Sequence, residues 1–261
     1  MSIPKIIHYC WFGGNPLPPL AKKCIRSWKK FCPDYKLMQW NEENFDLSRA
    51  PLYVRQAYEA KKWAFVTDYV RLYAMTQFGG IYMDTDVEVI RPLDRFLSHR
   101  AFSGFEDEVN IPTGIMACEK NFPMFEKLLA YYDTASFYHP DGSMNLTTNV
   151  TIITELCLQH GLQQNNTYQV IEGFALYPKD VFCPVSYATM ELEKTENTHT
   201  IHWFSGSWHT AQQKKEKKKY DAYLRREQMK YRLSRLPNKI GMAVFGEKRY
   251  VKIRRFLKGH D

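Results

Sequence analysis

The sequence predicts an α/β fold, in which helices flank a sheet, and three observations support this. Short apolar runs rich in β-branched residues, such as Ile3–Tyr9 and Ile81–Met83, are typical of buried strands. Longer segments between them repeat apolar residues at helical spacing. Gly and Pro residues separate the two kinds of segment. This alternation favours a sheet covered by helices, with ligands bound where the strands end.

The expected elements follow one another along the chain. The first strand, Ile3–Tyr9, leads into a loop at Trp11–Pro16 that contains two glycines. A proline stops the helix expected at Leu20–Phe31. A longer helix over residues 60–78 ends at Gly79-Gly80. Further strands are expected at Tyr35–Trp40, Ile81–Met83, Val87–Ile90, Ala101–Phe105, Gly114–Ala117 and Thr200–Phe204, and further helices at Pro123–Tyr132 and Asn149–His160.

Length and composition suit one α/β enzyme domain with a tail. The chain has 261 residues, of which 44% are hydrophobic and 15% aromatic. Aromatic residues fill cores, and they also stack on nucleobases and sugars. The six cysteines form no C-x-x-C pair, which favours reduced thiols over a zinc or redox site. The sequence shows neither a signal-peptide pattern nor an apolar run of about 18 residues, so we expect a cytoplasmic location.

The net charge of +8 is unevenly distributed. Residues 212–261 contain 17 Lys or Arg and 5 Asp or Glu, a net charge of +12 that leaves −4 for the residues before them. We therefore expect an enzyme domain at residues 1–211 and a basic, amphipathic, helical tail at 212–261. Apolar residues among the charges suit a helix lying on anionic lipid. A solvated helical cap on the domain is an equally good interpretation.

The motif Asp84-Thr85-Asp86 directly follows the apolar strand Ile81–Met83. In an extended segment residues i and i+2 point the same way, so both carboxylates would face one ion. Mg²⁺ and Mn²⁺ prefer oxygen ligands and complete their shells with water and substrate phosphates. Such an ion would neutralise a leaving nucleoside diphosphate. Two solvated aspartates in a surface turn are the alternative.

Two further groups are candidates to complete this site. Asp68 and Arg71 share a helix face, where they either form an ordinary ion pair or contact sugar and phosphate oxygens. His202 is a candidate third metal ligand, because imidazole suits Mn²⁺. Ser207 and the indole of Trp208 are candidate donors to phosphate oxygens. The alternative is a core histidine beside core tryptophans.

Other polar and aromatic residues are candidates for the donor and acceptor sides. Trp11 stacks on a nucleobase or packs in the core, and Gly13 and Gly14 permit close approach of a ligand. Thr113-Gly114 and Thr147-Thr148-Asn149 are candidates to line the sugar and acceptor side. Helix capping is the alternative for Thr148 or Asn149.

The combination of motifs resembles glycosyltransferase family 32. The resemblance is carried by the opening IPKIIHYCWFGG, by the pattern A-x-x-x-D-x-x-R at Ala64, Asp68 and Arg71, and by the run FGGIYMDTDV. That family includes initiation-type mannosyltransferases of yeast, bacterial capsule and lipopolysaccharide sugar transferases and, more distantly, clostridial glucosylating toxins. The resemblance covers residues 3–97 and resumes at His202–Trp208.

The resemblance implies a GT-A fold, with a Rossmann-like sheet that binds a nucleotide sugar, and a retaining transfer that uses Mn²⁺ or Mg²⁺. Many members have Thr-Gly-Pro where this chain has Thr148-Asn149-Val150, so the acceptor side is not assigned. The residues that resemble functional positions are Trp11 for base stacking, Asp68 and Arg71 for the donor sugar, Asp84 and Asp86 for metal and diphosphate, and His202, Ser207 and Trp208 for a loop that closes on metal and phosphates.

The expected reaction moves a hexose to a glycan or lipid-linked glycan in the synthesis of a surface polysaccharide such as capsule or lipopolysaccharide. A UDP-hexose is the favoured donor and GDP-mannose the alternative. The sequence places no carboxylate clearly as a covalent nucleophile, which favours front-face attack assisted by the leaving phosphate. The enzyme would be cytoplasmic, or peripheral on the inner face of the membrane.

Two other functions are open at this point. A D-x-D phosphohydrolase typically has Thr or Val two positions after the second aspartate, where this chain has Glu88. A non-catalytic protein would use its basic tail on a membrane surface or on nucleic acid. Nucleic acid is the less expected partner, because the apolar residues of the tail suit a lipid surface better.

Overall fold

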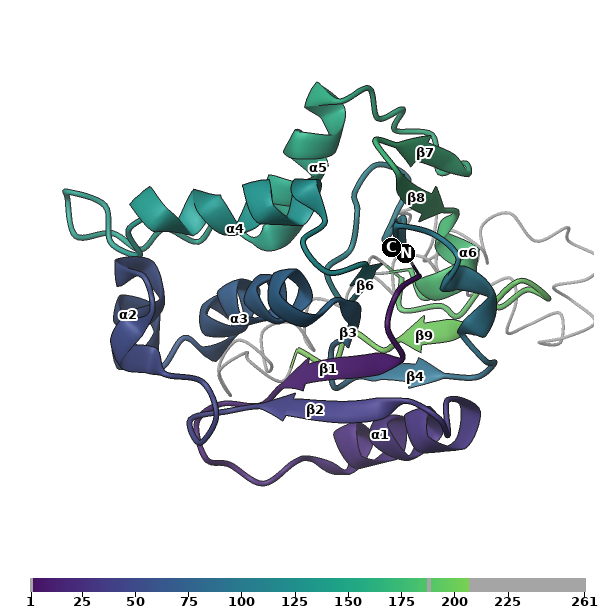
Figure 1. Cartoon of the computed structure of the whole chain (residues 1–261), viewed down its shortest axis with the longest axis horizontal. Coiled ribbons are helices and arrows are strands. Elements are labelled where there is room, and N and C mark those ends of the chain that lie inside the picture. The colour runs from purple at the N-terminus through teal and green to yellow at the C-terminus, as the bar shows by residue number, and fades with distance from the viewer. Residues whose placement is uncertain (1, 187–188, 207–261) are drawn as a thin grey trace, which may run out of the picture. The chain divides into compact units, whose positions relative to one another are not determined.

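The computed structural model describes residues 2–186 and 189–206, and within them the predicted α/β class is confirmed (Figure 1). The main sheet has the strand order β2-β1-β3-β6-β5-β8-β7. Its strands are β1 (Ile6–Cys10), β2 (Lys36–Trp40), β3 (Gly80–Met83), β5 (Ala101–Gly104), β6 (Ile115–Cys118), β7 (Gln169–Ile171) and β8 (Phe174–Tyr177).

The sheet is mixed, and its parallel part positions two of the predicted site loops. β1 pairs in parallel with both β2 and β3, and His8 lies opposite Tyr82. β6 runs antiparallel to β3 and β5, and β5 runs parallel to β8. The carboxyl ends of parallel strands meet at one edge of a sheet. Trp11 and Asp84, which follow β1 and β3, therefore lie at the same edge.

Helices cover both faces of the sheet and enclose two apolar cores. α1 (Pro19–Phe31) begins with a proline at its first turn, and its fully buried Trp28 donates its indole N–H to the Val87 carbonyl at 2.7 Å. The other face carries α2 (Leu52–Glu59), α3 (Trp63–Phe78), α4 (Pro123–Thr134) and α5 (Asn149–Gln159). Figure 1 shows α1 below β1 and β2, with α3 above them. The short helix α6 (Lys179–Phe182) joins the core on the α1 side.

A second, two-stranded sheet brings the late part of the domain to the first part. β4 (Val87–Val89) pairs antiparallel with β9 (Thr200–His202), and His202 lies opposite Val87. Because β4 starts directly after Asp86, this pairing carries His202 to the D-x-D motif.

One helix boundary and four short elements differ from the sequence prediction. The helix predicted over residues 60–78 begins at Trp63, because Lys61 adopts a left-handed backbone with φ 55° that separates α3 from α2. The sequence analysis does not predict α2, β7, β8 or α6. The last three are only three or four residues long, which is too short for a periodic pattern to show.

The conformation of the D-x-D motif is a correction. Asp84-Thr85-Asp86 is not extended, as the sequence argument assumes, but forms a turn in which the Val87 amide donates to the Asp84 carbonyl at 3.0 Å. The chain turns here because it leaves the main sheet at Met83 and enters the second sheet at Val87. The two carboxylates therefore converge through a turn and not through strand alternation.

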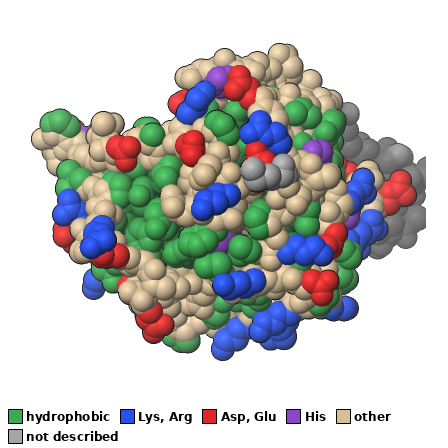
Figure 2. Space-filling view, viewed as in Figure 1, with side chains coloured by type: hydrophobic (Ala, Val, Ile, Leu, Met, Phe, Trp, Pro, Cys, Tyr) green, Lys and Arg blue, Asp and Glu red, His purple; other side chains and the backbone are tan. Residues whose placement is uncertain are grey.

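Basic charge is also present on the folded domain. α1 contains no acidic residue, and its exposed basic side chains are Lys22, Lys23, Arg26, Lys29 and Lys30. Figure 2 shows Lys and Arg side chains along the lower edge of the molecule, where Figure 1 places α1. The predicted boundary between residues 1–211 and 212–261, and the predicted helical tail, lie outside the described residues.

The described part of the chain contains no helix that is both long and apolar enough to cross a membrane. All six cysteines are buried and carry free thiols.

Candidate active site

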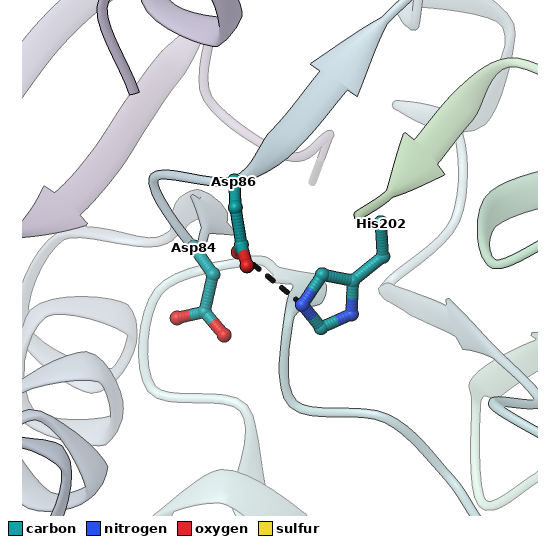
Figure 3. A group of neighbouring side chains, drawn as sticks. All are labelled: Asp84, Asp86 and His202. Atoms are coloured by element: carbon teal, nitrogen blue, oxygen red, sulfur yellow. Dashed lines mark ion pairs between the residues drawn. The ribbon is translucent and has the colours of Figure 1, made fainter. Parts of the chain in front are cut away.

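Asp84, Asp86 and His202 converge at the edge of the main sheet (Figure 3). One ligand atom from each side chain lies within 4.8 Å of those of the other two. The two aspartates come from the turn between β3 and β4, and the histidine ends β9. Asp86 and His202 are 14% and 10% exposed, and Asp84 is 29% exposed. The cluster therefore has a buried side and an open side.

The donor set fits a divalent ion such as Mn²⁺ or Mg²⁺. Two carboxylates and one imidazole are ligands that Mn²⁺ accepts, and Mg²⁺ favours the carboxylates. Ligands about 2.1 Å from one ion lie up to about 4.2 Å apart, so a small movement would close this set. The Nδ1 atom of His202 is buried and makes no hydrogen bond of good geometry. The predicted grouping of Asp84, Asp86 and His202 is thus seen in the structure.

Asp86 and His202 shift each other's pKa values in opposite directions. His202 Nε2 lies 3.3 Å from Asp86 Oδ1, and the Ser205 amide donates to Asp86 Oδ2 at 2.8 Å. Burial opposes ionisation of Asp86, but His202 and Ser205 outweigh it and hold the pKa of the carboxyl well below its usual value. Burial would likewise lower the pKa of His202, but Asp86, together with the nearby Cys183 thiol, raises it.

Asp84 is oriented by two neighbours. Tyr82 donates its hydroxyl to Asp84 Oδ1 at 2.8 Å, and Arg71 Nη2 lies 3.6 Å from the same oxygen. The Arg71 guanidinium also lies over the Tyr82 ring, 4.7 Å from its centroid. The Asp84 amide is held as well, because it donates to the Gly114 carbonyl at 2.8 Å. These contacts fix one carboxylate oxygen and leave the other without a hydrogen bond to the described residues.

Asp68 and Arg71 are buried behind this cluster, 6% and 4% exposed. Arg71 Nη2 lies 3.1 Å from Asp68 Oδ1, and Arg71 Nη1 donates to the Thr113 carbonyl at 2.7 Å. Burial raises the pKa of Asp68 to about 6, against the opposing charge of Arg71. Arg71 therefore links Asp68 to Asp84, and any contact of this pair with a sugar stays a prediction.

Asn149 joins the same buried group. Its side-chain amide donates to the Asp68 carbonyl at 2.6 Å, and its side-chain oxygen accepts from the Tyr132 hydroxyl at 2.6 Å. Thr148 precedes α5 and makes no side-chain capping hydrogen bond. The capping interpretation of Thr148 is therefore wrong. The start of this helix is held instead by the hydrogen bonds of the Asn149 side chain to the Asp68 carbonyl and the Tyr132 hydroxyl.

The residue that packs against the His202 ring is Gly114, and a larger residue would not fit there. A Cβ atom at Gly114 would lie 2.6 Å from His202 Cε1, which is shorter than any real contact. The imidazole therefore packs directly on the backbone of the segment before β6.

An open pocket of about 780 Å³ lies where β1 and β2 end. Trp11, Gly13 and Gly14 line it, as do Tyr58 and Trp63. Trp11 is half-buried and donates its indole N–H to the Asn15 carbonyl, which fixes the orientation of the ring.

The group that closely approaches Gly13 is a side chain of the protein, Trp63, and not a ligand. Gly13 has φ +91°, and a Cβ there would lie 2.7 Å from the indole of Trp63. Trp63 thus packs on the loop where the sequence analysis expects a ligand, while Gly14 has open space around it.

Sequence reasoning missed three residues near these sites: Tyr82, Glu42 and Glu106. Tyr82 could have been found from its place two residues before Asp84. Glu106 is half-buried in the loop after β5, where burial raises the pKa of its carboxyl and His202 opposes the rise. No motif surrounds Glu106 or Glu42, so the sequence carried no signal for them. Ser207 and Trp208 lie outside the described residues.

Comparison with known proteins identifies a family match in the first half of the chain. Residues 18–103 match the family model described as a glycosyltransferase sugar-binding region containing a DXD motif. The region is a DXD glycosyltransferase domain. The matched residues include Asp68, Arg71, Asp84 and Asp86. The resemblance found in the sequence is thereby confirmed, and the described residues form the α/β sheet flanked by helices that it implied.

Curated relatives of the glycosyltransferase domain include fungal enzymes. Inositol phosphoceramide mannosyltransferase 3 of Schizosaccharomyces pombe is 29% identical over 143 residues, which are 53% of this chain and 40% of that protein. Mannosyl phosphorylinositol ceramide synthase SUR1 of Saccharomyces cerevisiae is 28% identical over 131 residues, 49% of this chain and 34% of that protein. The chain thus spans less than half the length of these relatives.

Two glycosyltransferases are among the solved structures that resemble this chain. The PaToxG glycosyltransferase is 20% identical with a TM-score of 0.48, over 60% of this chain and 70% of that one. The galactosyltransferase LgtC is 14% identical with a TM-score of 0.41, over 79% of this chain and 90% of that one.

Proposed function

We propose that this protein is a metal-dependent, retaining glycosyltransferase that moves a hexose from a nucleotide sugar to a glycan or lipid-linked glycan. The observation that carries the proposal is the convergence of Asp84, Asp86 and His202 within a DXD glycosyltransferase domain. An aromatic pocket opens at the same edge of the sheet. A nucleotide sugar has a diphosphate for the first site and a base for the second.

Each residue has a role in this proposal. Asp84, Asp86 and His202 would hold Mn²⁺ or Mg²⁺, which supplies positive charge to the diphosphate of the donor. Arg71 holds Asp84 in place and adds a fixed positive charge behind it. Trp11 offers a ring face to the nucleobase. The acceptor hydroxyl attacks from the face that the diphosphate leaves, so that configuration is retained.

The acceptor and the location belong to the same proposal. One relative is named for mannosyl transfer to inositol phosphoceramide, and another for synthesis of mannosyl phosphorylinositol ceramide. Both names describe a sugar that is attached to a lipid. We infer an acceptor of this general class, in the synthesis of a surface polysaccharide. The basic residues 212–261 would hold the enzyme at the inner face of the membrane, with its site in the cytoplasm. Deletion of residues 212–261 should then release the protein from anionic vesicles.

A donor panel tests the function directly. The full chain is incubated with Mn²⁺ and each of UDP-glucose, UDP-galactose, UDP-N-acetylglucosamine and GDP-mannose, and donor hydrolysis is measured. A UDP-hexose is the donor that the sequence analysis favours, and GDP-mannose is the alternative. One donor should be consumed, and consumption should stop on addition of a chelator. Asp84→Asn and Asp86→Asn should each lower the rate by at least about 100-fold.

Two results would contradict the proposal. Full transfer by both aspartate variants with metal present would remove the ion from the scheme. Phosphate release from simple phosphoesters, with no sugar donor consumed, would favour a phosphohydrolase. Glu88 argues against that alternative, because its carboxylate is already held by Lys23 and by the Trp203 indole at 2.8 and 2.9 Å.

A further inference from the structure

The pocket beside Trp11 has an acidic edge that the proposed function does not explain. Aromatic rings line the pocket, and Glu42 and Glu43 belong to the same lining. Among the described residues that line it, Lys61 is the one basic side chain. A pocket for a phosphate or a sugar carboxylate would be basic. Two carboxylates instead indicate a ligand that presents hydrogen-bond donors.

Glu42 is fixed in position by the protein. Its Oε1 atom accepts from the Gly13 amide at 2.7 Å and from the Tyr58 hydroxyl at 3.3 Å. The turn that carries Glu42 is closed by Asn41 and Asn44, whose side chains accept from backbone amides at 3.0 Å. The carboxylate is thus held in place before a ligand arrives.

Acceptor capacity remains on this carboxylate. A carboxylate has about four lone-pair positions, and the two bonds to Gly13 and Tyr58 use two of them. Oε2 makes no hydrogen bond to the described residues. Both bonds fall on Oε1, so it is Oε2 that can accept two more hydrogen bonds, from adjacent donors on one planar edge.

Only one common nucleobase presents such an edge. Guanine has two adjacent donors, N1–H and the N2 amino group, and both can point at one carboxylate oxygen such as Oε2. Uracil places its single N3–H between two carbonyl acceptors, which a carboxylate would repel. Adenine and cytosine each place a ring acceptor beside their amino group.

We propose that Glu42 selects guanine in the pocket beside Trp11, so that the sugar donor is a guanosine diphosphate sugar. The inference rests on the proposed function, because it assigns the base of the same donor. Trp11 supplies the ring face and Glu42 accepts from N1–H and the N2 amino group. The donor class that the sequence analysis favours, a UDP-hexose, is thereby replaced by the alternative, a GDP-sugar.

Calorimetry with the full chain and Mn²⁺ tests this assignment with four ligands: GDP, IDP, UDP and ADP. IDP differs from GDP only by the absence of the N2 amino group. GDP should bind roughly 10- to 100-fold more tightly than UDP or ADP, and IDP should be weaker than GDP by about 10-fold. Glu42→Gln keeps an acceptor for the Gly13 amide, so the loop should remain in place.

The variant gives the decisive comparison. Glu42→Gln should weaken the binding of GDP by roughly 10- to 100-fold and should leave the affinity for UDP unchanged. GDP and IDP should then bind this variant with equal affinity. Glu59→Gln, which removes the same charge from exposed α2 outside the pocket, should change nothing. Tighter binding of UDP than GDP, or equal losses for UDP and GDP in Glu42→Gln, would overturn the assignment of guanine and leave the proposed function standing. If no nucleoside diphosphate binds with Mn²⁺, both fail.

Discussion

The Tyr82 hydroxyl donates to Asp84 Oδ1 at 2.8 Å, and this bond orients the first aspartate of the D-x-D motif. Arg71 approaches the same oxygen at 3.6 Å. With one oxygen held by the protein, the other makes no hydrogen bond to the described residues and can serve as a ligand atom. Tyr82 is fully buried, so the bond is shielded from water.

Replacement of Tyr82 by phenylalanine should weaken Mn²⁺ binding by about 10- to 100-fold, because partners that orient metal ligands typically contribute this much. The measurement is a Mn²⁺ titration followed by calorimetry. Tyr35→Phe is the matched control, since the buried Tyr35 hydroxyl has no partner among the described residues and its loss should leave Mn²⁺ affinity unchanged. Equal affinity of wild type and Tyr82→Phe would show that Asp84 needs no such orientation.

Replacement of Arg71 by methionine should lower the free energy of unfolding by about 3–5 kcal/mol, because it leaves Asp68 buried without its cation. Urea denaturation measures the loss. Arg100→Met provides the comparison, since Arg100 is about half exposed and pairs with Glu119 at 2.7 Å. That surface pair should contribute at most about 1 kcal/mol. A loss at Arg71 no larger than the loss at Arg100 would contradict the buried network.

Substitution of Gly114 by alanine should disturb the metal cluster without straining the backbone. Its φ is not in the left-handed region, so the effect comes from the new methyl group against His202. Overpacking of this kind costs about 1–3 kcal/mol, and the imidazole must move to relieve it. Mn²⁺ affinity should fall by about 10-fold or more. Gly142→Ala, where a Cβ meets nothing within 4 Å, should keep its Mn²⁺ affinity.

His8 should make the domain sensitive to acid. The Trp40 indole donates to His8 Nδ1 at 3.1 Å, and His8 Nε2 donates to the Gly79 carbonyl at 2.8 Å, so the ring is held neutral. Burial lowers its pKa to about 4. Unfolded chains bind a proton at His8 below about pH 6.5, where the folded state does not, so stability is lost as pH falls from about 6.5 to 4.

The size of this effect is about 3 kcal/mol at the acid end of that range. Urea denaturation at several pH values gives the free energy of unfolding. The effect of His8 is the difference between wild type and His8→Gln in how steeply this free energy falls with decreasing pH. Glutamine keeps an acceptor for Trp40 and a donor for Gly79 but does not titrate here. Identical pH profiles of the two proteins would show that His8 is not held neutral.

Much of the site could be predicted because its motifs are local. Asp84 and Asp86 follow a strand of four buried residues, and Asp68 and Arg71 share one face of α3, so short-range patterns reveal both pairs. The role of His202 required a resemblance as well, because its approach to Asp86 depends on pairing between β4 and β9. No periodic pattern specifies which distant strands pair.

The remainder depends on three-dimensional packing. Glu42 comes to the pocket because the loop after β2 lies beside the loop after β1, where the Gly13 amide meets it. The turn at Asp84 was missed because the sequence does not show where the chain changes sheets. The break before Trp63 depends on the left-handed backbone of Lys61, a conformation that lysine seldom adopts.

The pairing of β4 with β9 also sets the order in which the protein matures. During synthesis the two aspartates leave the ribosome early, whereas His202 emerges only near the end of the described domain. An incomplete chain therefore has two of the three candidate ligands and cannot close the set. Competence to hold the ion through all three residues would therefore require a chain synthesised through β9.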